Sequence, residues 1–291
     1  MRSAFGSWLI ERRIARVALI AALLPLFGIV SAAIVVCASM ARGWREGLVD
    51  CLIALAVLLG LTSLSGGGVP QVLFSGVSTW SVALLMGGLT GAYGSLTLAI
   101  QAIVMLGCMA ILGFAVIVGD PAEFWGPILQ TFAAQMQGFG IELSDSNAIM
   151  DLVPIMIGLF AAGTLASSIV ALLLGCWWAG GARGVDFREL FLGLRLGYII
   201  GAVAAIAGVG SLLGMQPLAG NLLLVAGTGF LFQGLAVVHW HAARRRLPWF
   251  MLIPVYVPLF MGSSLFVMAL MLFATLGFID NWYGLRRAKQ V

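Results

Sequence analysis

The sequence predicts an all-α protein, a polytopic transmembrane helical bundle with eight to ten membrane segments. Hydrophobic residues make up 62% of its 291 residues and charged residues only 9%, whereas soluble domains carry about 25% charged residues. The mean hydropathy is +1.11, and apolar runs recur along the chain instead of forming a single tail. Because a spanning helix needs about 20 residues, we expect residues 1–291 to form one integral membrane domain.

Hydropathy divides the chain into separate apolar segments. They cover residues 14–40, 46–65, 74–93, 95–118, 150–178, 193–214, 218–240 and 250–279. Pro25 and Gly28 interrupt the first segment, and Pro254, Pro258 and Gly262 interrupt the last. Proline breaks or kinks a helix. Each of these two segments is therefore either a hairpin or re-entrant pair of arms, each about 13 residues long and rising about 20 Å, or a single kinked helix.

The distribution of charge favours two hairpins. All 15 Lys and Arg residues fall in short stretches at the ends of apolar segments, whereas the connection at 119–149 contains acidic residues and no basic one. Loops rich in Lys and Arg face the cytoplasm, so this acidic connection is expected outside. With a hairpin at each end of the chain, every basic residue and both termini lie on the cytoplasmic side.

The acidic connection is predicted to contain an external amphipathic helix near 121–137. Asp120 suits the N-cap and Pro121 the first turn, and the helix is expected to end near Gly138 or Gly140. Its apolar stripe consists of Phe124, Trp125, Ile128, Leu129, Phe132 and Met136. Such a helix either lies in the outer interface of the membrane or forms a lid over a cavity that faces outward.

The middle of the predicted membrane interior contains amides but no ionisable residue. Ion-coupled transporters commonly place carboxylates there, so an autonomous ion-driven pump is not expected. A buried amide usually bonds to a neighbouring helix. Ligand binding is the alternative, and Gln233 is its best candidate because Gly229 and Gly234 allow another backbone or a ligand to come close. The candidate ligand-binding residues are Gln233, Gln101, Asn221, Asp151 and Asn147.

No catalytic, metal or cofactor site is predicted. The four cysteines lie within or at the ends of apolar segments and lack CxxC spacing, which is typical of apolar packing. His239 and His241 point to different sides of a helix, and no third ligand lies nearby in the sequence. A nucleophile with a base and an orienting group is not found. Nucleic acid is not expected as a partner, because the net charge of +4 lies in juxtamembrane loops.

Several motifs in the C-terminal third resemble a known family. They are FRELF at 187–191, LRL at 194–196, FQGLA at 232–236 and LGFIDNW at 276–282, followed by Arg286. These motifs are similar to those of the YybS-like family of predicted bacterial membrane proteins, whose function is unknown. The resemblance implies a protein of the bacterial cytoplasmic (inner) membrane. It also implies a relation in fold to the substrate-binding subunits of energy-coupling-factor vitamin transporters, which are compact bundles with both termini inside.

Charged residues at the end of the last helix suggest a polar clasp. Asp280 and Arg286 are expected to pair at the cytoplasmic end of that helix, with Arg195 as a competing partner for Asp280. The clasp residues are thus Asp280, Arg286 and Arg195.

Three hypotheses on function follow. In the first, the chain is a non-catalytic subunit that binds or transports a small molecule or lipid and works with a membrane protein partner in the lipid bilayer. In the second, it is a membrane assembly or interaction scaffold without a ligand, whose polar residues only hold helices together. The third, a membrane enzyme that modifies lipid, has the least support because the interior lacks a catalytic constellation.

Overall fold

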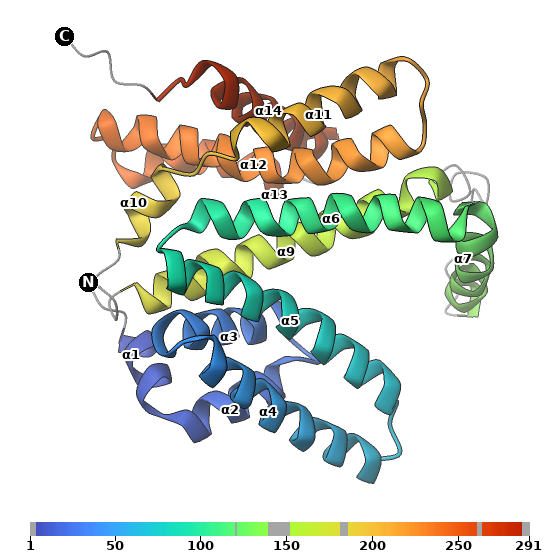
Figure 1. Cartoon of the computed structure of the whole chain (residues 1–291), viewed down its shortest axis with the longest axis vertical. Coiled ribbons are helices and arrows are strands. Elements are labelled where there is room, and N and C mark those ends of the chain that lie inside the picture. The colour runs from blue at the N-terminus through green and yellow to red at the C-terminus, as the bar shows by residue number, and fades with distance from the viewer. Residues whose placement is uncertain (1–3, 120, 139–151, 181–185, 261–263, 287–291) are drawn as a thin grey trace. The chain divides into compact units, whose positions relative to one another are not determined.

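The computed structural model describes residues 4–119, 121–138, 152–180, 186–260 and 264–286, and its regular elements are helices (Figure 1). In chain order they are α1 (Ala4–Glu11), α2 (Arg13–Leu23), α3 (Gly28–Arg42), α4 (Trp44–Leu64), α5 (Val69–Tyr93), α6 (Leu96–Val118), α7 (Pro121–Gly138), η1 (Val153–Ile155), α9 (Met156–Ala179), α10 (Phe187–Leu192), α11 (Gly197–Leu212), α12 (Leu218–Arg244), η2 (Trp249–Leu252), α13 (Ile253–Phe260) and α14 (Ser264–Tyr283). The predicted all-α class is confirmed for this part of the chain.

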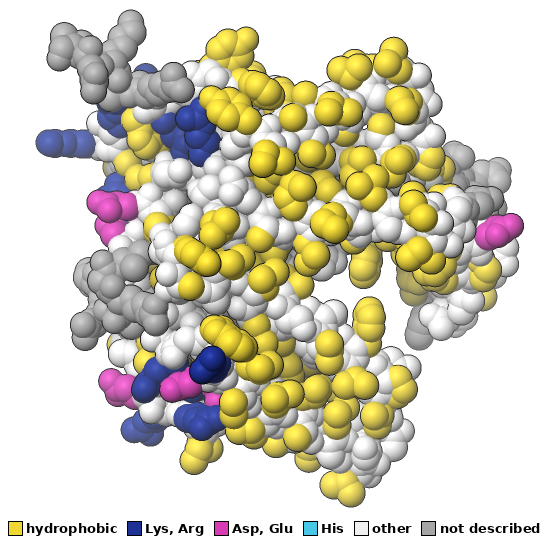
Figure 2. All heavy atoms as spheres, viewed as in Figure 1, with side chains coloured by type: hydrophobic (Ala, Val, Ile, Leu, Met, Phe, Trp, Pro, Cys, Tyr) yellow, Lys and Arg dark blue, Asp and Glu magenta, His cyan; other side chains and the backbone are white. Residues whose placement is uncertain are grey.

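Six helical stretches among the described residues are long and apolar enough to cross a membrane. They are α4, α5, α6, η1 with α9, α12 and α14, while α3 and α11 are shorter apolar helices. Hydrophobic side chains are spread over the helix surfaces (Figure 2), and on α11 Ile206 and Leu212 are 74% and 88% exposed. Large exposed apolar surfaces are unfavourable in water and suit lipid. The chain is therefore a multi-pass helical membrane protein.

The helices form two compact units. Unit 1 consists of Met1–Ile103, Ala166–Arg195 and Ala236–Pro248, and unit 2 of Val104–Leu165, Leu196–Leu235 and Trp249–Val291. Helices α6, α9 and α12 each contribute residues to both units.

In unit 1 the first apolar segment forms a hairpin. Helix α2 stops two residues before Pro25, and α3 begins at Gly28. The Ser31 hydroxyl donates to the carbonyl oxygen of Ile20 at 2.7 Å, and Arg42 donates to that of Ile10 at 3.0 Å. Ile20 lies on α2 and Ile10 on α1, so the second pair lies farther from the turn on both sides of it. Helix α3 therefore runs antiparallel to the chain that precedes the turn. The interpretation as a single kinked helix is wrong.

Helix α3 is the core of unit 1. All of its residues from 31 to 40 are buried. Glycines on α5 allow this close packing: a Cβ added at Gly87 would lie 2.9 Å from the carbonyl oxygen of Val36, and one added at Gly91 would lie 3.0 Å from Cα of Met40. These small residues thus let the α5 and α3 backbones pack closely within the unit.

In unit 2 the last apolar segment divides unequally. The predicted length of about 13 residues fits the first arm, because η2 and α13 together cover residues 249–260. It is wrong for the second, because α14 has 20 residues and is long enough to span a membrane. Pro254 and Pro258 both lie within α13, where each removes a backbone hydrogen-bond donor. Helix α14 contains no proline and continues to Tyr283. The third predicted breaker, Gly262, lies outside the described residues.

Helix α7, also in unit 2, confirms the amphipathic helix expected near 121–137. The predicted N-cap, Asp120, lies outside the described residues. Within the predicted apolar stripe Leu129 is buried, whereas Phe124, Ile128 and Phe132 are 43%, 47% and 48% exposed. The exposed row, spaced four residues apart on one face, suits a helix that lies in a membrane interface more than a lid closed over a cavity.

Candidate functional site

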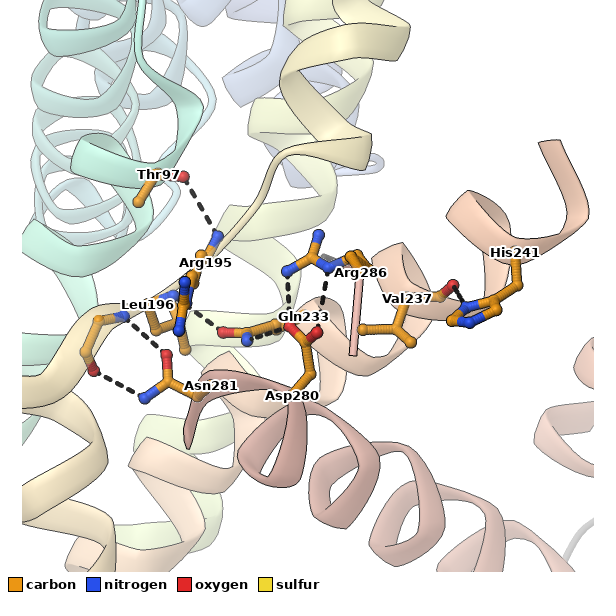
Figure 3. A network of polar contacts seen from close by, with 10 residues as sticks. Thr97, Arg195, Leu196, Gln233, Val237, His241, Asp280, Asn281 and Arg286 are labelled. Atoms are coloured by element: carbon orange, nitrogen blue, oxygen red, sulfur yellow. Dashed lines mark hydrogen bonds and ion pairs between the residues drawn. The ribbon is translucent and has the colours of Figure 1, made fainter. Parts of the chain in front are cut away.

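A polar centre forms in unit 2 where α11 begins and α12 approaches α14 (Figure 3). We call the side chains of Gln233, Asp280, Asn281 and Arg286 the unit 2 centre. Oε1 of Gln233 accepts a hydrogen bond from the N–H of Leu196 at 2.8 Å, and its Nε2 donates to Oδ2 of Asp280, also at 2.8 Å. Arg286 forms an ion pair with the same carboxylate at 2.6 Å. Gln233 therefore links the entry of α11 to the end of α14.

Asn281 makes a second link to the start of α11. Its Oδ1 accepts from the N–H of Gly197 at 2.8 Å, and its Nδ2 donates to the carbonyl oxygen of Gly197 at 2.9 Å. The first N–H groups of a helix have no acceptor within that helix. Gln233 and Asn281, which lie on two other helices, supply these acceptors to Leu196 and Gly197.

Two glycines bring the elements of the unit 2 centre together. A Cβ added at Gly234 would overlap the carbonyl oxygen of Phe273, and one added at Gly277 would overlap that of Phe230. The backbones of α12 and α14 therefore touch directly. This contact places Gln233, next to Gly234, within reach of Asp280, one helical turn after Gly277. Gly234, one of the two glycines that made Gln233 the best candidate for ligand binding, thus allows the close approach of α14.

The charges of the unit 2 centre are paired, and its carboxylate is buried. Gln233 and Asn281 have no exposed surface, and Asp280 is 1% exposed. A buried carboxylate is tolerated when an opposite charge and hydrogen-bond donors surround it, and here Arg286 and Gln233 provide them. The structure thus joins Asp280 and Arg286 of the predicted clasp. Arg195 belongs to unit 1, where its N–H lies 3.4 Å from Oγ1 of Thr97.

Asn221 links another pair of helical elements in unit 2. Its Oδ1 accepts from the N–H of Gly158 at 3.1 Å, and its Nδ2 donates to the carbonyl oxygen of Pro154 at 2.9 Å. Asn221 is 2% exposed. It joins the first turn of α12 to η1 and the first turn of α9, which is the role of helix attachment rather than of a free recognition group.

Of the other predicted ligand-binding residues, Gln101 alone lies in the described part of the chain. Gln101 is half-buried on α6 in unit 1. Asn147 and Asp151 lie outside the described residues.

A second polar centre, in unit 1, was not predicted from the sequence. Asp50 has no exposed surface and pairs with Arg16 at 2.6 Å and with Arg13 at 2.8 Å. Arg16 is 2% exposed and also donates to the carbonyl oxygens of Leu9 and Ile10, each at 3.1 Å. One buried guanidinium thus connects the end of α1, the start of α2 and helix α4. We call Arg13, Arg16 and Asp50 the unit 1 centre.

The sequence carried a signal for the unit 1 centre. Asp50 is a carboxylate inside the apolar segment 46–65, and Arg13 and Arg16 lie on one face of a helix because they are three residues apart. The sequence alone predicts these arginines only as cytoplasmic charges at the end of an apolar segment. Their pairing with Asp50 follows from the hairpin. Helix α3 ends beside α1, where Arg42 bonds to Ile10, and α4 begins there.

The chemistry of these centres is that of helix attachment. Both carboxylates are paired with arginine. Among the described residues, no group of three or more His, Cys, Asp and Glu side chains is arranged to hold a metal ion. His239 packs its ring against Phe191, and Nδ1 of His241 lies 3.0 Å from the carbonyl oxygen of Val237 on its own helix. The two histidines thus contact different neighbours.

Long apolar helices that are fastened by buried ion pairs and amides define a multi-pass helical membrane protein. Comparison of the chain with known protein families, with curated proteins and with solved structures finds no match.

Proposed function

We propose that the protein is a non-catalytic membrane assembly or interaction scaffold. The observation that carries this proposal is the state of Gln233, the best candidate for ligand binding. Its side chain is buried, and both ends of its amide are bonded to the protein, to Leu196 and to Asp280. Both ends of the Asn221 amide are likewise bonded to the protein. The interior amides with described bonds thus support helix attachment, the second of the three hypotheses.

Energetics agree with such a role. A hydrogen bond between membrane helices contributes about 0.6–2 kcal/mol. A buried ion pair gains little over an apolar pair, but breaking it is costly, and such pairs serve in some proteins to fix one arrangement of elements. The two centres therefore support a protein that needs defined helix positions, as a scaffold for a partner would.

Binding and transport of a small molecule or lipid with a partner is the second candidate function. The short hairpin of α2 and α3 supports it, because short helices interrupted by Pro or Gly point to the substrate sites of transporters. Such sites commonly involve interrupted helices in both halves of the chain. The unequal division of α13 and α14 weakens that correspondence.

Replacing Gln233 distinguishes these two functions. Gln233→Leu roughly keeps the side-chain volume but removes the acceptor of the Leu196 N–H and one donor to Asp280, which keeps its ion pair with Arg286. We therefore expect the unfolding free energy to fall by about 1–3 kcal/mol. Thermal unfolding in mild detergent measures the loss. Native mass spectrometry of wild type and variant measures what remains bound. For a scaffold, the mass spectra of the two proteins show the same bound lipids.

Thr228→Val is the matched control on α12. The Thr228 hydroxyl bonds only within its own helix, to the carbonyl oxygen of Leu224 at 2.9 Å, so the unfolding temperature should change little. The contrary outcome is a stoichiometric polar molecule that copurifies with wild type and with Thr228→Val but is lost from folded Gln233→Leu. That outcome would contradict the scaffold function and support ligand binding.

We also propose that the protein belongs to the YybS-like family and lies in the bacterial inner membrane with both termini in the cytoplasm. The motifs at 232–236 and 276–282 support the family, and the unit 2 centre draws residues from both. The position of all basic residues at the ends of apolar segments supports the orientation.

Labelling of single cysteines in intact cells tests the orientation. We expect Arg2→Cys and Lys289→Cys to resist a maleimide that cannot cross the membrane, and Glu123→Cys on α7 to react with it. Glu123 is exposed, so it serves as the external control. Labelling of either terminus without prior permeabilisation would contradict a cytoplasmic location.

A further inference from the structure

Three arginines lie at the C-terminal end of α12, more than the one cation that complements a helix dipole. Helix α12 has 27 residues, so it rises about 40 Å, whereas the hydrocarbon core of a bilayer is about 30 Å thick. Its last turn therefore reaches the headgroup region. Arg244, Arg245 and Arg246 follow one another there, and all three are exposed. One cation in the last turn complements the helix dipole, and that effect fades beyond this turn.

The last of these arginines occupies a position that favours glycine. The N–H of Leu247 donates to the carbonyl oxygen of Ala242 at 2.9 Å, and that of Arg246 donates to Ala243 at 3.1 Å. This is the Schellman pattern, in which the residue after the helix is left-handed and is usually Gly. Arg246 adopts φ 51, the one positive φ among the described non-glycine residues. The chain thus retains a cation where glycine would fit with less strain.

Trp240 holds the first arginine in place. The Arg244 guanidinium lies 5.2 Å from the centre of the Trp240 ring, within the range of a cation–π contact. Tryptophan is enriched at the level of lipid headgroups. Leu247, directly after the arginines, is 42% exposed. A tryptophan, three exposed arginines and an exposed leucine therefore all fall within residues 240–247, at the end of a spanning helix.

We propose that Arg244, Arg245 and Arg246 form a binding site for the phosphate of an anionic phospholipid headgroup. The planar guanidinium matches phosphate oxygens with two parallel hydrogen bonds. Basic clusters beside a membrane helix bind acidic lipids. A lipid is favoured over free phosphate because Trp240 and Leu247 offer apolar contacts next to the cations, and only a lipid has chains to meet them. This site is independent of the scaffold function proposed above.

Lipid titration of the full chain, followed by native mass spectrometry, tests the site. We expect wild type to prefer phosphatidylglycerol to phosphatidylcholine. Each guanidinium that bonds to the headgroup phosphate contributes about fivefold in affinity, so the variant R244Q/R245Q/R246Q should lose about 100-fold. Millimolar inorganic phosphate should leave phosphatidylglycerol bound. Full displacement by inorganic phosphate would identify a site for free anions, and equal affinity for both lipids would exclude a headgroup site.

A variant with the same charge provides the matched control. R12Q/R45Q/R188Q removes three exposed arginines elsewhere in unit 1, and Arg45 also lies over a tryptophan ring, at 5.6 Å. The site predicts a much smaller loss of phosphatidylglycerol affinity in this control than in R244Q/R245Q/R246Q. Equal losses would mean general charge attraction and overturn the site.

Arg246→Gly separates charge from folding. Glycine relieves the left-handed backbone, so the unfolding temperature should stay the same or rise, while loss of one guanidinium–phosphate contact lowers the affinity for phosphatidylglycerol about fivefold. This result stands even if the triple variant fails to fold. A stable Arg246→Gly protein with unchanged lipid affinity would contradict the proposal.

Discussion

Asp50→Ala is expected to lower the unfolding free energy of the protein by about 3–5 kcal/mol, because it leaves the buried charge of Arg16 without a counter-ion. Arg16 is 2% exposed and cannot turn toward solvent without dismantling the junction of α1, α2 and α4. The carbonyl oxygens of Leu9 and Ile10 still accept from its guanidinium, but they carry no net charge. Unfolding followed by tryptophan fluorescence in detergent measures the loss.

Two further variants show whether the buried charge is the cause. Arg13→Gln removes the other partner of Asp50. The Arg13 side chain is 53% exposed, and exposed ion pairs contribute at most about 1 kcal/mol. Arg16→Met combined with Asp50→Leu removes both buried charges and should recover much of the loss, since apolar replacements of a whole pair are often tolerated. Equal destabilisation by Arg13→Gln and Asp50→Ala would show that burial of Arg16 is not what matters.

The unit 1 centre marks the limit of sequence reasoning in this protein. Hydropathy located the apolar segments, and Pro25 and Gly28 located the turn between α2 and α3, because both signals act over a few residues. The meeting of Arg16 with Asp50 depends instead on how far α3 returns along α2. That register is decided by packing, here by the glycines of α5 against α3, and no local pattern encodes it.

Gln233 shows the same limit, because the sequence indicates a close contact there but not which element makes it. Its glycine neighbours correctly indicated a close approach, but they did not identify what approaches. The answer, the backbone of α14 with Asp280 behind it, lies 47 residues away in sequence. The pairing of Asp280 with Arg286 was predictable because six residues at a helix end are a local separation. Polar centres in a helical membrane protein are thus predictable within an element and uncertain between elements.

Gly277→Val is expected to prevent stable packing of α12 against α14. Its Cβ would overlap the carbonyl oxygen of Phe230, a backbone atom that cannot move without displacing α12. Overpacking in a core costs about 1–3 kcal/mol even where side chains can adjust. A loss of at least about 3 kcal/mol is expected here, because the same displacement would separate Gln233 from Asp280 and leave buried polar groups unpaired. Yield in the membrane fraction and thermal unfolding in detergent both report the change.

Gly227→Ala tests whether the crossing itself, and not the loss of a glycine, is responsible. Gly227 lies on α12, and a Cβ added there meets nothing within 4 Å, so alanine should be neutral or stabilise the helix by up to about 1 kcal/mol. Gly234→Ala, whose Cβ would overlap the carbonyl oxygen of Phe273, should destabilise as Gly277→Val does, since the two glycines face one another across the same crossing. If Gly234→Ala folds like Gly227→Ala, the helices do not meet at these glycines, and the bond between Gln233 and Asp280 loses the contact that positions it.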